Sequence, residues 1–91
     1  MVAKGKKKGV VQFSIKPPSE AIQVYLAGAF KDWQPIPMRK QKDGSFAVEV
    51  ALPAGKHEYK FVLGNQWITD PDHNRCAPNP YGSLNSVVQV D

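Results

Sequence analysis

The chain has 91 residues, of which 42% are hydrophobic and 22% charged, and its formal net charge is +4. This length provides one domain with a single core, and no apolar run reaches the roughly 18 residues that a membrane-spanning helix needs. No apolar segment follows the basic N-terminus, so we do not interpret it as a secretory signal. The single cysteine, Cys76, excludes an intrachain disulfide, and we expect a cytoplasmic protein.

The positive charge is concentrated at one end of the chain. Lysine occupies positions 4, 6, 7 and 8, and the other eight basic residues balance the eight acidic ones. Short stretches of lysine and glycine are typically disordered and solubilising. We therefore expect a flexible basic tail over residues 1–9 and a folded domain over residues 10–91. An alternative is that the tail contacts nucleic acid, but the balanced charge of the domain offers no basic stripe to extend such a contact.

Strand patterns recur along the chain, and no helical period is present. The first strand is expected at residues 11–15, where Val11, Phe13 and Ile15 alternate with polar residues. Further strands are expected at residues 22–26, 38–42, 46–52, 57–63, 67–69 and 86–90. Turns rich in glycine and proline separate them, and an irregular loop is expected at residues 70–81. About seven short strands connected in this way predict an all-β fold, an antiparallel β-sandwich.

The strand at residues 57–63 gives the clearest assignment of faces. Tyr59 and Phe61 belong to its apolar side, so Lys60 between them points to the outer face of the sheet. Trp67 follows across a tight turn. We therefore expect Trp67 to lie on the same side of the sheet as Lys60.

Both tryptophans lie in turn-rich segments instead of hydrophobic runs. An indole on a loop presents a flat surface on which a flat ligand, either a sugar ring or a base, can stack. The alternative is that Trp33 or Trp67 covers the edge of the core. Lys60, Asn85 and the turn at residues 81–83 add polar partners for hydroxyl groups, whereas a nucleic acid would require several cations near its phosphates.

Residues suited to catalysis or metal binding are sparse. His57 lies at a core-facing strand position and is interpreted as a packed histidine. Asp70, Asp72 and His73 could be imagined as metal ligands, but the Asp-Pro-Asp sequence is more typical of an Asx turn. The chain has no glycine-rich phosphate loop and no distinctive carboxylate pair. We therefore predict a non-catalytic protein without metal or cofactor.

Three segments, in order, resemble a known family. Residues 24–33 read VYLAGAFKDW, residues 58–62 read EYKFV and precede Gln66-Trp67, and residues 79–87 read NPYGSLNSV after Asp70-Pro71. They resemble the family 48 carbohydrate-binding modules, which include the glycogen-binding domains of AMP-activated protein kinase β subunits and the N-terminal domains of isoamylase-type debranching and branching enzymes. The resemblance covers roughly residues 10–90 and implies an immunoglobulin-like β-sandwich that binds α-1,4-linked glucans.

The resemblance also implies roles for individual residues. Trp33 and Trp67 correspond to the tryptophans that stack on glucose rings. Lys60, Ser83 and Asn85 correspond to residues that form hydrogen bonds with the sugar.

Some positions depart from the family pattern. Tyr81 stands where the family often has an aliphatic residue that threads against the glucan, so the resemblance implies a glucan contact there, and we expect the aromatic ring to stack instead. Lys31-Asp32 replaces an asparagine-rich dipeptide, and Gly64-Asn65 reverses the usual order at a turn. None of these departures removes a residue expected to contact the sugar.

The resulting hypothesis is non-catalytic binding of glycogen, starch or maltooligosaccharides by a tryptophan platform with lysine and asparagine hydrogen bonds. The alternative is a protein-interaction or regulatory scaffold domain of a kinase or glycogen-metabolism assembly. Expected partners are an α-glucan and, in addition, such an enzyme or kinase. Neither a nucleic acid nor a membrane is expected.

Overall fold

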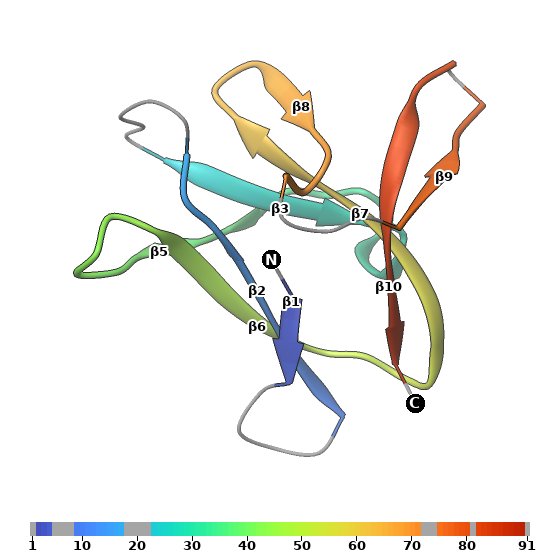
Figure 1. The fold of residues 1–91 in the computed structure, drawn as a ribbon, viewed down its shortest axis with the longest axis horizontal. Helices are drawn as coiled ribbons and strands as arrows, with labels where there is room; N and C mark the ends of the chain where they lie inside the picture. Colours follow the sequence, from blue (N-terminus) through green and yellow to red (C-terminus); the bar gives the residue numbers. More distant parts are fainter. Residues whose placement is uncertain (1, 5–8, 18–22, 72–74, 81, 91) are drawn as a thin grey trace.

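The computed structural model describes residues 2–4, 9–17, 23–71, 75–80 and 82–90, which form two antiparallel sheets (Figure 1). The elements in chain order are β1 (Val2–Lys4), β2 (Val10–Ile15), β3 (Val24–Gly28), the 3₁₀ turn η1 (Ala29–Lys31), β4 (Ile36–Pro37), β5 (Arg39–Lys40), β6 (Phe46–Ala51), β7 (Gly55–Leu63), β8 (Gln66–Ile68), β9 (Cys76–Pro78) and β10 (Leu84–Val90). One sheet has the order β1-β2-β6-β5 and the other β4-β3-β7-β10-β9, with β8 paired to β7. This small sandwich confirms the predicted all-β fold. The described residues contain no helix with the length and apolarity of a membrane span.

Three short strands were not expected from the sequence. They are β1, β4 and β9, each of only two or three residues. Pro37 ends β4 and Pro78 ends β9, and both strands lie at sheet edges, where a residue without an N–H group is tolerated. These segments are extended because each pairs with a longer strand. Their own sequences show little of the alternation that predicts a strand. β1 falls within the segment 1–9 assigned to a tail and pairs with β2, while the domain boundary at residue 10 stays a prediction.

The core follows the alternation of the longer strands. Its largest fully buried side chains include Tyr59, Phe13 and Phe61, and the Phe13 and Tyr59 rings meet edge to face with centroids 4.9 Å apart. The other buried members of the cluster are Val11, Ile15, Val24, Leu26, Met38, Phe46, Leu52 and Val88. Each burial of such a side chain is worth about 1.5–3 kcal/mol. Neither tryptophan belongs to this cluster.

Strand β7 changes its hydrogen-bonded neighbour at one residue, Lys60. β3 pairs with β7 along residues 59–63 on one edge. On the other edge, β10 pairs with residues 55–59 and β8 with residues 61–63. The β7–β8 and β9–β10 hairpins extend toward the same end of the molecule (Figure 1). Lys60 therefore lies where the two hairpins part.

The end of β3 has room only for glycine. A Cβ added to Gly28 would overlap the edge of the Phe30 ring, formed by its Cε2 and Cζ atoms. The Phe30 ring is itself held between Phe13, at a centroid distance of 5.9 Å, and His57, at 6.2 Å. Because the ring has little freedom to move, we expect Gly28→Ala to cost about 1–3 kcal/mol of unfolding free energy. Urea unfolding measures this cost, and an unchanged midpoint would show that the ring relocates freely.

Candidate functional site

Trp67 lies exposed on the outer face of the second sheet. It is directly opposite Val62 in β7, which in turn is opposite Tyr25 in β3. Residues opposite one another share a face of the sheet, and so do residues two apart along a strand. Lys60, two residues before Val62, is therefore on the same face as Trp67, as predicted. The Trp67 side chain is 46% exposed, which is unusual for so large an apolar group.

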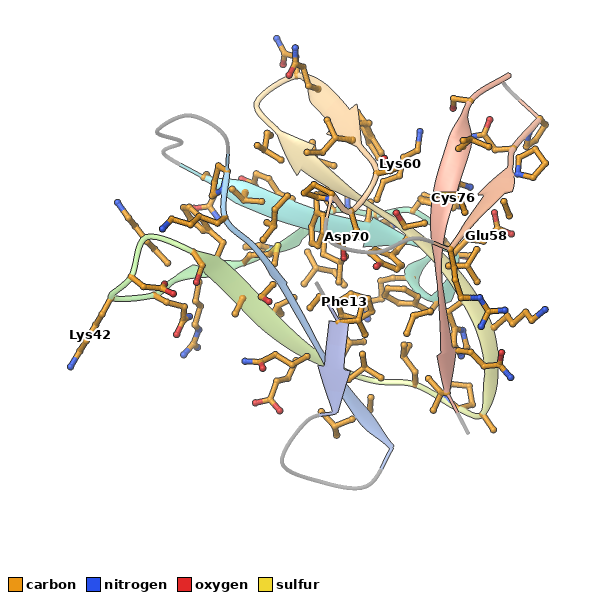
Figure 2. The ribbon with its side chains drawn as sticks, in the orientation of Figure 1. Phe13, Lys42, Glu58, Lys60, Asp70 and Cys76 are labelled. Carbon is orange, nitrogen blue, oxygen red and sulfur yellow. The ribbon has the colours of Figure 1, made fainter. Side chains whose placement is uncertain are left out.

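A polar cluster lies on the same face of the sheet as Trp67, Val62 and Tyr25. The Lys60 ammonium donates to the Ser83 hydroxyl at 3.2 Å, and its side chain extends between the β7–β8 and β9–β10 hairpins (Figure 2). Asn85 in β10 donates from Nδ2 to Glu58 Oε1 at 2.9 Å. The structure thus brings three of the predicted residues, Lys60, Ser83 and Asn85, into one connected group.

Two members of the cluster were missed in the sequence. Asn79 connects Ser83 and Asn85 through its side-chain amide, with Nδ2 at 2.7 Å from Ser83 Oγ and 3.0 Å from Asn85 Oδ1. Glu58 is on the same face of β7 as Lys60 and accepts from Asn85. The Asn-Pro dipeptide at residues 79–80 predicts a turn, and strand alternation places Glu58 on the same face as Lys60. Only the tertiary pairing of the strands shows what either side chain contacts.

Trp33 occupies the loop that leaves β3. Gly28, the last residue of β3, is opposite Tyr59, so this loop begins beside the part of β7 that carries Lys60. The Trp33 N–H donates to the Gly28 carbonyl at 2.8 Å, and the side chain is half-buried. In the described part of the chain, no hydrogen bond or ring contact joins Trp33 to the polar cluster.

The backbone at Trp33 has an uncommon conformation. Asp32 and Trp33 have φ values of 54° and 62°, in the left-handed region that few non-glycine residues adopt. Asp tolerates this region better than most residues, whereas an aromatic residue there carries strain of order 1 kcal/mol or more. The loop therefore holds the Trp33 backbone in this conformation at a cost in stability.

The remaining sequence candidates divide into two groups. Tyr81, Asp72 and His73 lie outside the described residues. Asp70 is 3% exposed, and its carboxylate accepts the Tyr59 hydroxyl at 2.8 Å. Asp70 thus makes a core contact, where the sequence had suggested local turn contacts only. Within the described ranges, no group of three or more potential ligands could hold a metal ion.

A buried hydrogen-bond network of Tyr59, Asp70 and Ser86 lies on the inner side of the sheet, behind the polar cluster. Tyr59 and Ser86 are directly opposite each other on β7 and β10, one residue away from Lys60 and Asn85, and they point to the interior. The Asp70 N–H donates to Ser86 Oγ at 2.7 Å while its carboxylate accepts from Tyr59. The network therefore joins β7, β10 and the segment after β8.

The phenol in this network predicts a loss of stability at alkaline pH. Burial, followed by the hydrogen bond to Asp70 and its negative charge, raises the pKa of Tyr59 far above its ordinary value. An unfolded tyrosine ionises near pH 10. Above that pH the unfolded state loses a proton that the folded state keeps, so stability is complete below about pH 10 and falls as the pH rises further. Urea midpoints between pH 8 and 11.5 measure this decline, and a parallel decline in Tyr59→Phe would contradict its assignment to this group.

The combined geometry suits a ligand with flat apolar faces and many hydroxyl groups. Trp67 provides an exposed ring, Lys60 provides hydrogen-bond donors, and Asn85 and Glu58 provide amide and carboxylate groups on the same face. A ring of this kind stacks on apolar C–H surfaces, while amide and charged groups pair with hydroxyls. Because the Lys60 ammonium and the Glu58 carboxylate are both present, the face does not have the purely positive charge that an anion-binding site would have.

Comparison with known sequences shows similarity to one family of domains. Residues 11–91 match the family model described as the glycogen recognition site of AMP-activated protein kinase. The β-1 subunit of this kinase from Sus scrofa is 34% identical over 68 residues, covering 75% of this chain and 54% of the relative. The human β-1 subunit is also 34% identical over 68 residues, which is 24% of its length. The Mus musculus β-2 subunit is 32% identical over 69 residues, 25% of its length.

Comparison with solved structures shows a shared fold. A maltogenic amylase from S. marinus superposes with a TM-score of 0.78 at 20% identity, covering all of this chain and 16% of the amylase. A putative α-amylase from Salmonella typhimurium gives a TM-score of 0.74 at 26% identity, covering 97% of this chain and 14% of that one. In each case the chain matches only a small part of a larger protein.

Proposed function

The chain belongs to the family of glycogen recognition sites of AMP-activated protein kinase, and from this membership we propose that it binds α-1,4-linked glucans such as glycogen, starch and maltooligosaccharides. The family domain is a recognition module, and the chain is accordingly non-catalytic. Its single cysteine is exposed and unpaired, which fits the cytosolic location that we propose with this function.

One observation carries the proposal. An exposed tryptophan lies on the same sheet face as a connected group of Lys60, Ser83 and Asn85. We assign Trp67 and Trp33 to stacking on glucose rings and the three polar residues to hydrogen bonds with sugar oxygens. Tyr81 is assigned a further contact with the glucan on its sequence position alone.

Isothermal titration with maltoheptaose tests the function. A shallow surface that covers a few sugar rings gains little net free energy after ordering costs, so we expect a Kd of roughly 1 µM to 1 mM. A cellooligosaccharide is the matched control because it has the same glucose units in β-linkage. Heat of binding with maltoheptaose but not with the cellooligosaccharide would support the proposal. Absence of binding at millimolar maltoheptaose would contradict it.

The names of the relatives favour a second candidate function. The curated relatives are kinase subunits, and the matched segment covers about a quarter of the human β-1 subunit. A domain in that setting is suited to hold a kinase or a glycogen-metabolism enzyme. Co-purification of such a partner that persists in excess maltoheptaose would support this function, and displacement by the sugar would favour the glucan site.

A further inference from the structure

Asn79 occupies the turn between β9 and β10 and is bound to it at both backbone and side chain. Its N–H donates to the Ser83 carbonyl at 2.9 Å, and its own carbonyl accepts from Gly82 at 3.3 Å. Its side-chain Oδ1 accepts the Ser83 N–H at 3.2 Å, while Nδ2 donates to Ser83 Oγ and to Asn85 Oδ1. A single side chain thus contacts two of the residues assigned to the sugar.

The partners at each end of this chain of hydrogen bonds determine the direction of both amides. The Ser83 N–H can only donate, so the atom of Asn79 that faces it must be Oδ1. A carboxylate such as Glu58 only accepts, so Asn85 turns Nδ2 toward it and Oδ1 toward Asn79. Each amide therefore has one orientation that satisfies its neighbours.

This order determines what Ser83 can offer to a ligand. Ser83 Oγ accepts from Lys60 at 3.2 Å and from Asn79 at 2.7 Å, which occupies both of its lone pairs. Among the described residues, its hydroxyl hydrogen has no acceptor. Asn85 likewise keeps one N–H and one lone pair, and the Lys60 ammonium keeps two N–H groups. Ser83 is thereby set as a donor to a sugar oxygen.

We propose that Asn79 is a positioning residue of the glucan site, which holds Ser83 and Asn85 in the orientation that receives sugar hydroxyls. The proposal rests on the proposed function. Asn79 itself acts through the two side chains it holds, because both Nδ2 hydrogens are directed to them. Pre-organised polar groups avoid the ordering cost that free side chains pay on binding.

Two variants separate positioning from turn formation. Asn79→Asp keeps an oxygen that accepts the Ser83 N–H but removes both donors, whereas Asn79→Ala removes the donors without adding charge and removes the acceptor of the Ser83 N–H as well. We expect both to weaken maltoheptaose binding by roughly 10-fold in calorimetry at pH 7, since ordering each of the two released side chains on binding costs about a few-fold in affinity. Gln41→Glu is the matched control for Asn79→Asp because it makes the same charge change on an exposed amide in the β5–β6 turn, next to the other sheet. It should bind as the wild type does.

A second measurement needs no sugar. The Asn85 side-chain amide protons are observed by NMR in the free protein, and we expect them to exchange with solvent roughly three to ten times faster in Asn79→Asp. Retained affinity in Asn79→Asp would overturn the proposal, because the side chain would then serve only the turn. Unchanged Asn85 exchange would overturn it too. If the wild type fails to bind maltoheptaose while Asn85 exchange still rises, the proposed function fails and the positioning role stands.

Discussion

Trp67→Ala is expected to weaken maltoheptaose binding about 30-fold while leaving the domain folded. The indole is 46% exposed and lies on the same sheet face as Lys60, so its truncation removes a stacking surface and little core packing. Central aromatic residues of binding surfaces typically contribute about 2 kcal/mol or more, and 1.4 kcal/mol corresponds to tenfold in Kd. Calorimetry gives the affinity, and urea unfolding should show a stability change within about 0.5 kcal/mol.

Leu84→Ala provides a matched control for this substitution. Leu84 is the other large exposed apolar side chain in the described part of the chain, with 50% of its surface accessible. Strand alternation directs it to the opposite face of β10 from Asn85. Leu84→Ala should therefore leave the affinity for maltoheptaose unchanged. Equal affinities for Trp67→Ala and the wild type would show that the ring does not contact the sugar.

Tyr59→Phe is expected to lower the unfolding free energy by about 2 kcal/mol. The phenol is fully buried and donates to Asp70, whose carboxylate is also buried. Removing only the hydroxyl leaves this charged group with one fewer donor, and hydrogen bonds to charged groups contribute about 1.5–3 kcal/mol. Urea unfolding at pH 7 measures the loss.

Tyr25→Phe is the control for removal of a phenol hydroxyl. Tyr25 is half-buried on the outer face of β3, and no hydrogen bond to its hydroxyl is present among the described residues. Its loss should change stability by no more than about 0.5 kcal/mol. Similar losses in the two variants would mean that the Tyr59–Asp70 hydrogen bond contributes little.

The local sequence predicted the main strands because side-chain alternation is a property of neighbouring residues. The period of two along residues 57–63 placed Tyr59 and Phe61 inside and Lys60 outside, as the structure shows. The glycine and proline turns placed the strand ends, and Asp43-Gly44 forms the expected hairpin, in which Asp43 accepts from Ser45 at 2.9 Å. The Ser45 hydroxyl donates to the same Asp43 oxygen at 2.6 Å, and this bond, followed by the one from the Ser45 N–H, lowers the pKa of Asp43.

The short strands β1, β4 and β9 could not be predicted from the local sequence, because they depend on pairing with a longer strand. β9 has only three residues, ends in Pro78 and lies within a proline-rich loop, so its extended form depends on pairing with β10. The same pairing brings Asn79 and Ser83 together across the turn, five residues of chain that carry no periodic signal.

The sequence by itself determined the sandwich and the outward direction of Lys60, because alternation along a strand separates the apolar side chains from the polar ones. It left open whether either tryptophan covers the edge of the core, and in the structure neither belongs to the core cluster. Only the tertiary structure decided which polar groups meet. Glu58 and Asn85 are 27 positions apart, and Lys60 and Ser83 are 23 apart, yet each pair is within hydrogen-bond distance. Such contacts depend on strand register and on the change of partner along β7, which are fixed by the packing of the whole domain and not by any local run of residues.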